Sequence, residues 1–159
     1  MMVAMKKEKI SKHITYNEAT RSETAKALGI DNTPNKKELE NIKRIAEEIF
    51  EPLRKWACHP IRINSCFRNE ALNRAIGGSK SSAHRHGFAF DLDSLGKKSN
   101  AELFKWMEKN LKFDQLIWEF GTEENPDWIH VGICEDKKNY RNQKLTATKS
   151  RSKTRYSFR

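Results

Sequence analysis

The chain has 159 residues, and its 31 Lys and Arg against 21 Asp and Glu give a formal net charge of +10. This length favours one domain with a real core. Three cysteines cannot all pair within one chain, which argues against a disulfide framework and fits a reducing cytosol. No apolar stretch is long enough for a membrane span, and the first residues are too polar for a secretory signal. The positive charge predicts a polyanionic partner or environment.

The amino-terminal third is predicted to be helical. Residues 1–13 are basic and lack periodicity, so we expect a loose lead-in. A capping box at Thr15 to Glu18 predicts a helix that is stopped by Gly29. Asn35 is predicted to cap a longer helix, because apolar residues then recur at threes and fours. Pro52 falls inside this pattern and should kink the helix or restart it as a first-turn proline.

The middle of the chain alternates between strand and helix patterns. Asn69 is predicted to cap a short helix that closes at Gly77 and Gly78, and Ser99 begins a capping box that opens another helix. Short strands are predicted at residues 61–65, 88–92, 115–120 and 128–133. The predicted fold class is therefore α+β, with a small antiparallel or mixed sheet and flanking helices.

Residues 137–159 form a basic carboxyl-terminal segment with nine Lys or Arg and no acidic residue. Alternation over residues 142–151 predicts a last edge strand that its lysines protect from pairing. The alternative is a flexible basic arm. Nucleic acid is not the partner that we favour, because the aromatic residues are few here and no nucleic-acid fold pattern accompanies them. The predicted organisation is a lead-in at 1–13, a domain at 14–136 and this basic segment.

His84, Asp91 and His130 are the candidate metal ligands. Two imidazoles and a carboxylate form the kind of set that holds catalytic Zn²⁺ and leaves one position open for water. The cysteines lack a CxxC pairing, which argues against a thiolate site. Gly87 lies between the first two ligands, where a turn or a close backbone approach favours a residue without Cβ. Together these residues predict a hydrolytic zinc site.

Two neighbouring residues offer alternative ligands. His84 and His86 could chelate a metal as an H-x-H pair, and Asp93 could replace Asp91. Alternation in the last predicted strand puts His130 on the face opposite the apolar residues Ile129 and Val131, where it would face a cleft.

Several ordered blocks carry a family resemblance. The pattern S-x-H-x-x-G-x-A-x-D begins at Ser82 and is followed by W-x-H at residues 128–130. Residues 63–68, 72–79 and 113–119 supply further blocks in the same order. The set resembles the zinc D-alanyl-D-alanine peptidases and the L-alanyl-D-glutamate endolysins of phages and bacteria, which share a metal-site fold with the amino-terminal domain of hedgehog proteins.

The resemblance implies roles for individual residues. It places one Zn²⁺ on His84, Asp91 and His130, with His86 in a variable position. It also implies a general base three residues before the last histidine, which is Asp127, and we keep Glu119 as a second candidate.

The resemblance further implies a substrate-binding role for Arg68, which would contact the substrate carboxylate or the developing oxyanion. Ser82 could orient the substrate. Cys66 stands where the resemblance would place a glycine, which leaves the local backbone geometry open.

The function expected from this resemblance is zinc-dependent hydrolysis of an amide bond in peptidoglycan. The enzyme would be a D-Ala-D-Ala carboxypeptidase or an endolysin-type endopeptidase, and the resemblance does not choose between them. We expect a monomer that is synthesised without a signal peptide, reaches the wall by phage lysis or on a virion, and is held there by its positive charge. The alternative is a non-catalytic, zinc-containing module that binds the wall or a protein partner.

Overall fold

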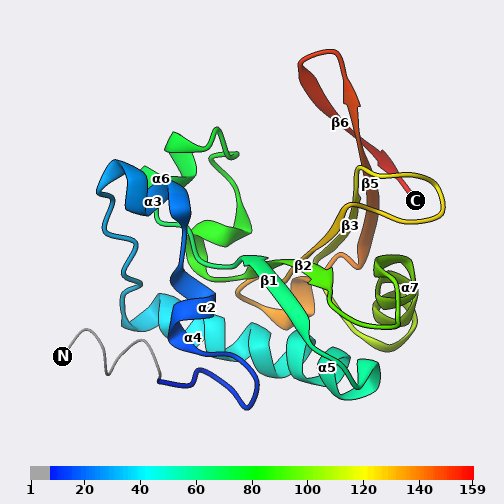
Figure 1. The fold of residues 1–159 in the computed structure, drawn as a ribbon, viewed down its shortest axis with the longest axis horizontal. Coiled ribbons are helices and arrows are strands. Elements are labelled where there is room, and N and C mark those ends of the chain that lie inside the picture. The colour runs from blue at the N-terminus through cyan, green and yellow to red at the C-terminus, as the bar shows by residue number, and fades with distance from the viewer. Residues whose placement is uncertain (1–7) are drawn as a thin grey trace.

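The computed structural model describes residues 8–159 and contains one six-stranded sheet with helices around it (Figure 1). The strand order is β1-β2-β4-β3-β5-β6, in which only β3 and β5 pair in parallel. The α+β class with a mixed sheet is therefore confirmed. The strands are β1 (Ile61–Ser65), β2 (Ala89–Ser94), β3 (Gln115–Glu119), β4 (Trp128–Gly132), β5 (Gln143–Ser150) and β6 (Lys153–Phe158).

The first predicted helix is two helices, α2 (Tyr16–Thr20) and α3 (Glu23–Leu28). The capping box at Thr15 is present, and Gly29 ends α3 in the left-handed conformation, as the sequence predicts. The break between the helices was not predicted. Arg21 and Ser22 are extended there, and the Ser22 side chain accepts a hydrogen bond from Ala25 N, so that Ser22 caps the second helix.

The long amphipathic helix is interrupted next to Pro52. It consists of α4 (Lys36–Ile45), a π-helical segment η1 (Ala46–Phe50) and α5 (Glu51–Ala57), with Pro52 in the first turn of α5. Proline has no N–H for an α-helical hydrogen bond, and the chain forms a wider turn just before it. The predicted restart at a first-turn proline is confirmed.

The remaining helices agree with the capping signals in the sequence. Asn69 and Ser99 cap α6 (Glu70–Ala75) and α7 (Asn100–Asn110), each by accepting a backbone N–H. Two 3₁₀ turns complete the described elements, η2 (Ala83–His86) and η3 (Lys137–Asn139).

One face of the sheet carries the hydrophobic core. Side chains alternate between the two faces along β2, β3 and β4. On one face, Phe90, Trp118 and Val131 belong to the same core cluster as residues of α4, η1, α5 and α7. Opposite residues of the same strands point to the other face, which carries the polar site. The core cluster includes Ile42, Ile45, Ile49, Phe50, Leu53, Phe90, Leu92, Leu103, Phe104, Met107, Leu116, Trp118, Ile129 and Val131.

Part of the predicted loose lead-in contacts the domain. Residues 1–7 lie outside the described residues, and of residues 8–13 only Ile10 is buried. Ile10 is only 9% exposed, and Glu51 accepts hydrogen bonds from Ser11 Oγ at 2.6 Å and His13 N at 2.8 Å. Glu51 thereby holds this part of the lead-in against α5.

The carboxyl-terminal segment forms the β5–β6 hairpin, residues 143–158, which projects from the body of the molecule (Figure 1). The strand predicted at 142–151 is present as β5, but it is not the edge strand. It pairs with β3 on one side and with β6 on the other. Among residues 8–159, no helix combines the length and the apolar character needed to span a bilayer.

Candidate active site

His84, Asp91 and His130 converge on one point of the polar face of the sheet. The Nε2 atom of His84 lies 3.2 Å from Asp91 Oδ1 and 3.3 Å from His130 Nδ1, and the last two atoms are 3.0 Å apart. Asp91 and His130 are direct partners in the antiparallel pairing of β2 and β4. Adjacent strands therefore fix two of the ligands, and η2 supplies the third.

Gly87 ends η2 and allows the chain to turn from His84 into β2. Its φ is +73°, in the left-handed region that favours glycine. A Cβ built on Gly87 would lie 2.7 Å from the carbonyl oxygen of Glu38 and 2.8 Å from a side-chain atom of Ile42. The prediction of a turn and a close backbone approach at Gly87 is confirmed, and the reason is the packing of η2 against α4.

The hydrogen bond of His84 to Cys66 shows how the three donor atoms suit a cation. His84 Nδ1 lies 2.7 Å from the carbonyl oxygen of Cys66, which can only accept, so Nδ1 carries the proton. In the neutral ring, the lone pair of Nε2 then points toward the oxygen of Asp91. Two acceptors that face each other require a positive charge between them, and the Cys66 carbonyl is the outer hydrogen-bond partner that metal-bound histidines use.

The distances within this triad also agree with zinc. Ligand bonds of roughly 2.0–2.1 Å in tetrahedral geometry separate neighbouring donor atoms by about 3.3 Å. The three observed separations, 3.0 to 3.3 Å, are close to this value. His84, Asp91 and His130 also form the one group of potential metal ligands that residues 8–159 bring together.

Burial and mutual contacts change the pKa values of His84 and Asp91. His84 is 1% exposed, and this burial lowers its pKa and favours the neutral ring that a metal needs. Burial alone would raise the pKa of Asp91, but its interactions with the imidazoles of His84 and His130 outweigh this effect, so the pKa of Asp91 is lowered. Asp91 is therefore an ionised ligand at neutral pH.

Glu119 lies on the same polar face at the end of β3. It is 8% exposed, and it lines the same cavity of about 640 Å³ as the three candidate ligands. Its pKa is raised to about 7, mainly by burial, while the positive charge of His130 opposes the shift and Asp91 adds to it. A carboxylate with such a pKa can exchange a proton near neutral pH.

Asp127 lies in the loop before β4 and is exposed. Its backbone N–H donates to the carbonyl oxygen of Glu119 at 3.0 Å, and its own carbonyl accepts from Asn100. Asp127 lines a neighbouring hollow together with Phe120 and Thr122, but it is absent from the lining of the metal cavity. Of the two candidates for the general base, Glu119 therefore lines the metal cavity and Asp127 does not.

Arg68 and Ser82 both line the metal cavity. The backbone N–H of Arg68 donates to the carbonyl oxygen of His84 at 3.1 Å, which ties the Arg68 loop to η2. Burial lowers the pKa of the guanidinium, although the nearby Asp91 opposes the shift. The buried Nε of Arg68 has no hydrogen-bond partner among the described residues. An unpaired buried donor at a cavity wall is suited to a ligand oxygen.

The structure separates the two alternative ligands from the triad. His86 is exposed, and Asp93 Oδ1 accepts a hydrogen bond from Asn100 at 2.9 Å. Neither belongs to the group of converging donor atoms. Cys66 is buried, its φ is not positive, and its carbonyl binds His84, so a side chain is accommodated where the resemblance places glycine.

The sequence reasoning missed the contribution of the β5–β6 hairpin to this cavity. Leu145, Thr154 and Tyr156 of the hairpin line it together with the candidate ligands, and so does Arg141 just before β5. The alternation in residues 142–151 could have indicated a strand, but no sequence signal indicated its pairing with β3.

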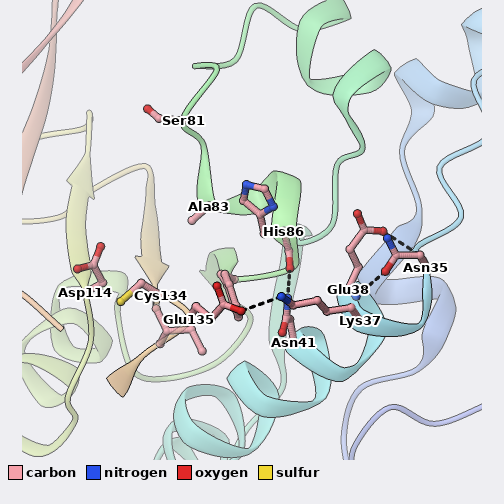
Figure 2. Close-up of a pocket in the computed structure, with 12 residues that line it drawn as sticks. Asn35, Lys37, Glu38, Asn41, Ser81, Ala83, His86, Asp114, Cys134 and Glu135 are labelled. Carbon is pink, nitrogen blue, oxygen red and sulfur yellow. Dashed lines mark hydrogen bonds and ion pairs between the residues drawn. The ribbon is translucent and has the colours of Figure 1, made fainter. Parts of the chain in front are cut away.

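A second hollow of about 450 Å³ adjoins the metal cavity (Figure 2). Ser81, Ala83 and Asp114 line both, so the two hollows share a border. Figure 2 shows Lys37 and Glu135 at its far side, where their side chains form an ion pair at 2.7 Å. The polar face of the molecule is thus hollowed beyond the metal cavity itself.

The fold and the three-ligand site define a zinc metallopeptidase. A family model described as peptidase M15 matches residues 12–132, which is more than half of the chain, and the chain belongs to this family. M15 peptidases are zinc-dependent, and His84, Asp91 and His130 are placed to hold one ion. The resemblance drawn from the sequence is confirmed, and family membership makes the protein a zinc metallopeptidase. No curated protein matches the chain.

Proposed function

We propose that this peptidase hydrolyses an amide bond in the stem peptide or cross-link of peptidoglycan, with Glu119 as its general base. The observation that carries the proposal is the single cavity that collects the His84, Asp91 and His130 triad, Glu119 and Arg68. Its M15 membership supports a peptide of the cell wall as the substrate. Overall, the amide C–N bond breaks, the acyl carbon gains a hydroxyl from water, and the amine gains a proton.

Zinc, when bound by the triad, supplies a Lewis acid that polarises a carbonyl and lowers the pKa of water. Glu119 would accept a proton from the attacking water and give it to the leaving amine. Its burial in the cavity and its pKa of about 7 support this role. We therefore propose Glu119 as the base in place of Asp127, which was the first choice from the sequence.

Arg68 would bind the carbonyl or carboxylate oxygen of the substrate. Its guanidinium offers several donors in a fixed plane, and its buried Nε has no partner among the described residues. Ser82 borders the same cavity and is half-buried, so its hydroxyl is accessible to a peptide group. We propose that these two residues hold the peptide while Glu119 moves the proton.

The positive charge of the chain supports a role at an anionic wall. The formal net charge is +10, and the β5–β6 hairpin beside the cavity carries basic residues and no acidic one. Wall polymers that carry phosphate would attract this surface at low ionic strength. We propose a monomer that is held on the wall by these charges after release by phage lysis or delivery on a virion.

Digestion of purified peptidoglycan tests the proposal. Wild-type protein should cut, Glu119→Gln should retain zinc and lose most activity, and Asp127→Asn is the matched control that should cut like wild type. Released D-alanine would identify a carboxypeptidase, whereas new amino termini on an intact stem would identify an endopeptidase. Zinc-loaded wild type that cuts no wall peptide would refute the proposed substrate, and an inactive Asp127→Asn beside an active Glu119→Gln would refute the choice of base.

A further inference from the structure

The β5–β6 hairpin lies outside the residues that match the family, yet it forms one wall of the metal cavity. The family match ends at residue 132, and the hairpin begins at Gln143. Leu145 on β5 and Thr154 and Tyr156 on β6 line the cavity together with Glu119. The shape of the cleft on this side therefore depends on a segment that the family pattern does not include.

Strand register places Tyr156 in one row with Glu119. Glu119 on β3 pairs with Ala147 on β5, and Ala147 pairs with Tyr156 on β6. Residues paired across neighbouring strands point to the same face of a sheet, so the three side chains share one face, from which Glu119 and Tyr156 line the cavity. Adjacent strands lie about 4.8 Å apart, which places the Glu119 and Tyr156 backbones about 10 Å apart. Between them, Ala147 offers only a fully buried methyl group.

The phenol of Tyr156 is available as a hydrogen-bond donor. The residue is 57% exposed although it lines the cavity, and within residues 8–159 its hydroxyl has no hydrogen-bond partner. Burial of its ring, with the negative charges of Glu119 and Asp91, raises its pKa, so the phenol keeps its proton at neutral pH.

Contacts at the end of the chain hold the hairpin in place. The guanidinium of Arg159 lies 3.9 Å from the ring centroid of Trp118, a core residue that is 1% exposed. Arg159 N also donates to the carbonyl of Lys144 at 3.0 Å, and Arg159 Nη1 to Thr146 Oγ1 at 3.2 Å. A wall that is fixed before the substrate arrives loses little entropy on binding.

We propose that Tyr156 is a substrate-binding residue whose hydroxyl donates a hydrogen bond to a backbone carbonyl of the bound stem peptide. The peptide would lie between Arg68 on one side of the triad and the β5–β6 hairpin on the other, since both line the same cavity. This inference rests on the proposed function. It adds a residue that orients the peptide from the cavity wall formed by the β5–β6 hairpin.

The substitution Tyr156→Phe removes only the hydroxyl, and Ser157→Ala, which also removes one hydroxyl, is its matched control. Ser157 lies on the same strand but on the alternate face, and it does not line the metal cavity. With a synthetic stem pentapeptide, Tyr156→Phe should raise KM about 3- to 10-fold with little change in kcat, as expected when one uniform binding contact is lost. Its zinc content and melting temperature should equal those of wild type.

Calorimetric binding of the same peptide to zinc-loaded Glu119→Gln supplies a readout without turnover. Adding Tyr156→Phe to this variant should weaken binding by the same factor, and adding Ser157→Ala should not. Equal affinities with and without the hydroxyl would overturn the role of Tyr156, as would a KM within twofold of wild type. Wild type that hydrolyses neither the stem peptide nor a cross-linked stem-peptide dimer would refute the proposed function instead. In that case, tight binding that depends on Tyr156 would still support the inference, and no binding would refute both.

Discussion

Glu119→Gln should stabilise the metal-free protein at alkaline pH, because the ionised carboxylate is buried at a cost. The pKa of Glu119 is raised from its ordinary value of 4.5 to about 7. The native state therefore binds this proton more tightly than the unfolded state, and the stability that it contributes is present at low pH and lost as the pH rises through 7. Each pKa unit corresponds to about 1.4 kcal/mol. Between pH 5 and pH 8, wild type should lose about 2.5 kcal/mol that the neutral glutamine does not lose.

Thermal unfolding of both proteins in chelator, at pH 5 and pH 8, measures this difference. For a domain of this size, the melting temperature of Glu119→Gln should gain roughly 5–10 °C on wild type between the two pH values. All other titrating groups are shared, so they cancel in the comparison. Parallel pH profiles for the two proteins would show that Glu119 titrates normally, and the proposal that it is a base with a raised pKa would then lose its main support.

Three further substitutions test the ligands, the turn and the substrate-binding arginine. Asp91→Asn should retain its circular dichroism spectrum but fall well below one zinc per chain in elemental analysis, because it removes the anionic ligand. Gly87→Ala should lose about 1–3 kcal/mol in urea unfolding, because it combines a φ of +73° with a Cβ only 2.7 Å from a carbonyl oxygen. Arg68→Lys should keep its zinc but lose about 10-fold or more in kcat/KM, because an ammonium group lacks the planar fork. Wild-type values in any of these would contradict the corresponding assignment.

The metal site was predictable from the sequence because its ligands sit in short, local patterns. His84 and Asp91 are seven residues apart, with Gly87 between them, and His130 belongs to a short alternating strand. Each pattern depends on strand alternation or on one turn, both of which are local properties. Two capping boxes and the cap residue Asn35 predicted the starts of three helices for the same reason.

The choice between Glu119 and Asp127 depended on contacts that the sequence does not contain. The two residues are eight positions apart, and both are acidic. Their difference arises because β3 is buried between β4 and β5, whereas the loop before β4 is open to solvent. Burial raises the pKa of Glu119, and the Asp127 side chain remains exposed. The resemblance pointed to Asp127 through its spacing from the last histidine, and this spacing carries no information about burial.

The pairing of β5 with β3 escaped prediction because parallel pairing links distant parts of a chain. β5 follows β4 in sequence but pairs with β3, so its partner is not its neighbour along the chain. Such a connection leaves no turn signature of the kind that marks a β-hairpin. The composition of residues 137–159 predicted an exposed basic segment, and the cleft-lining role of Tyr156 depends entirely on the register of β3, β5 and β6.

The two faces of the central sheet have different roles: one carries the hydrophobic core, and the other carries the candidate active site. On one face, residues such as Phe90 and Trp118 pack against the helices in a contiguous apolar core. On the other face, one residue further along the same strands, Asp91 and Glu119 place buried carboxyl groups close together, where burial opposes their ionisation. Buried charges of this kind are costly unless they are paired, and the core face offsets that cost. A cation at the triad would remove the unfavourable acceptor contacts, so zinc binding should raise the stability of the whole domain as well as enable its chemistry.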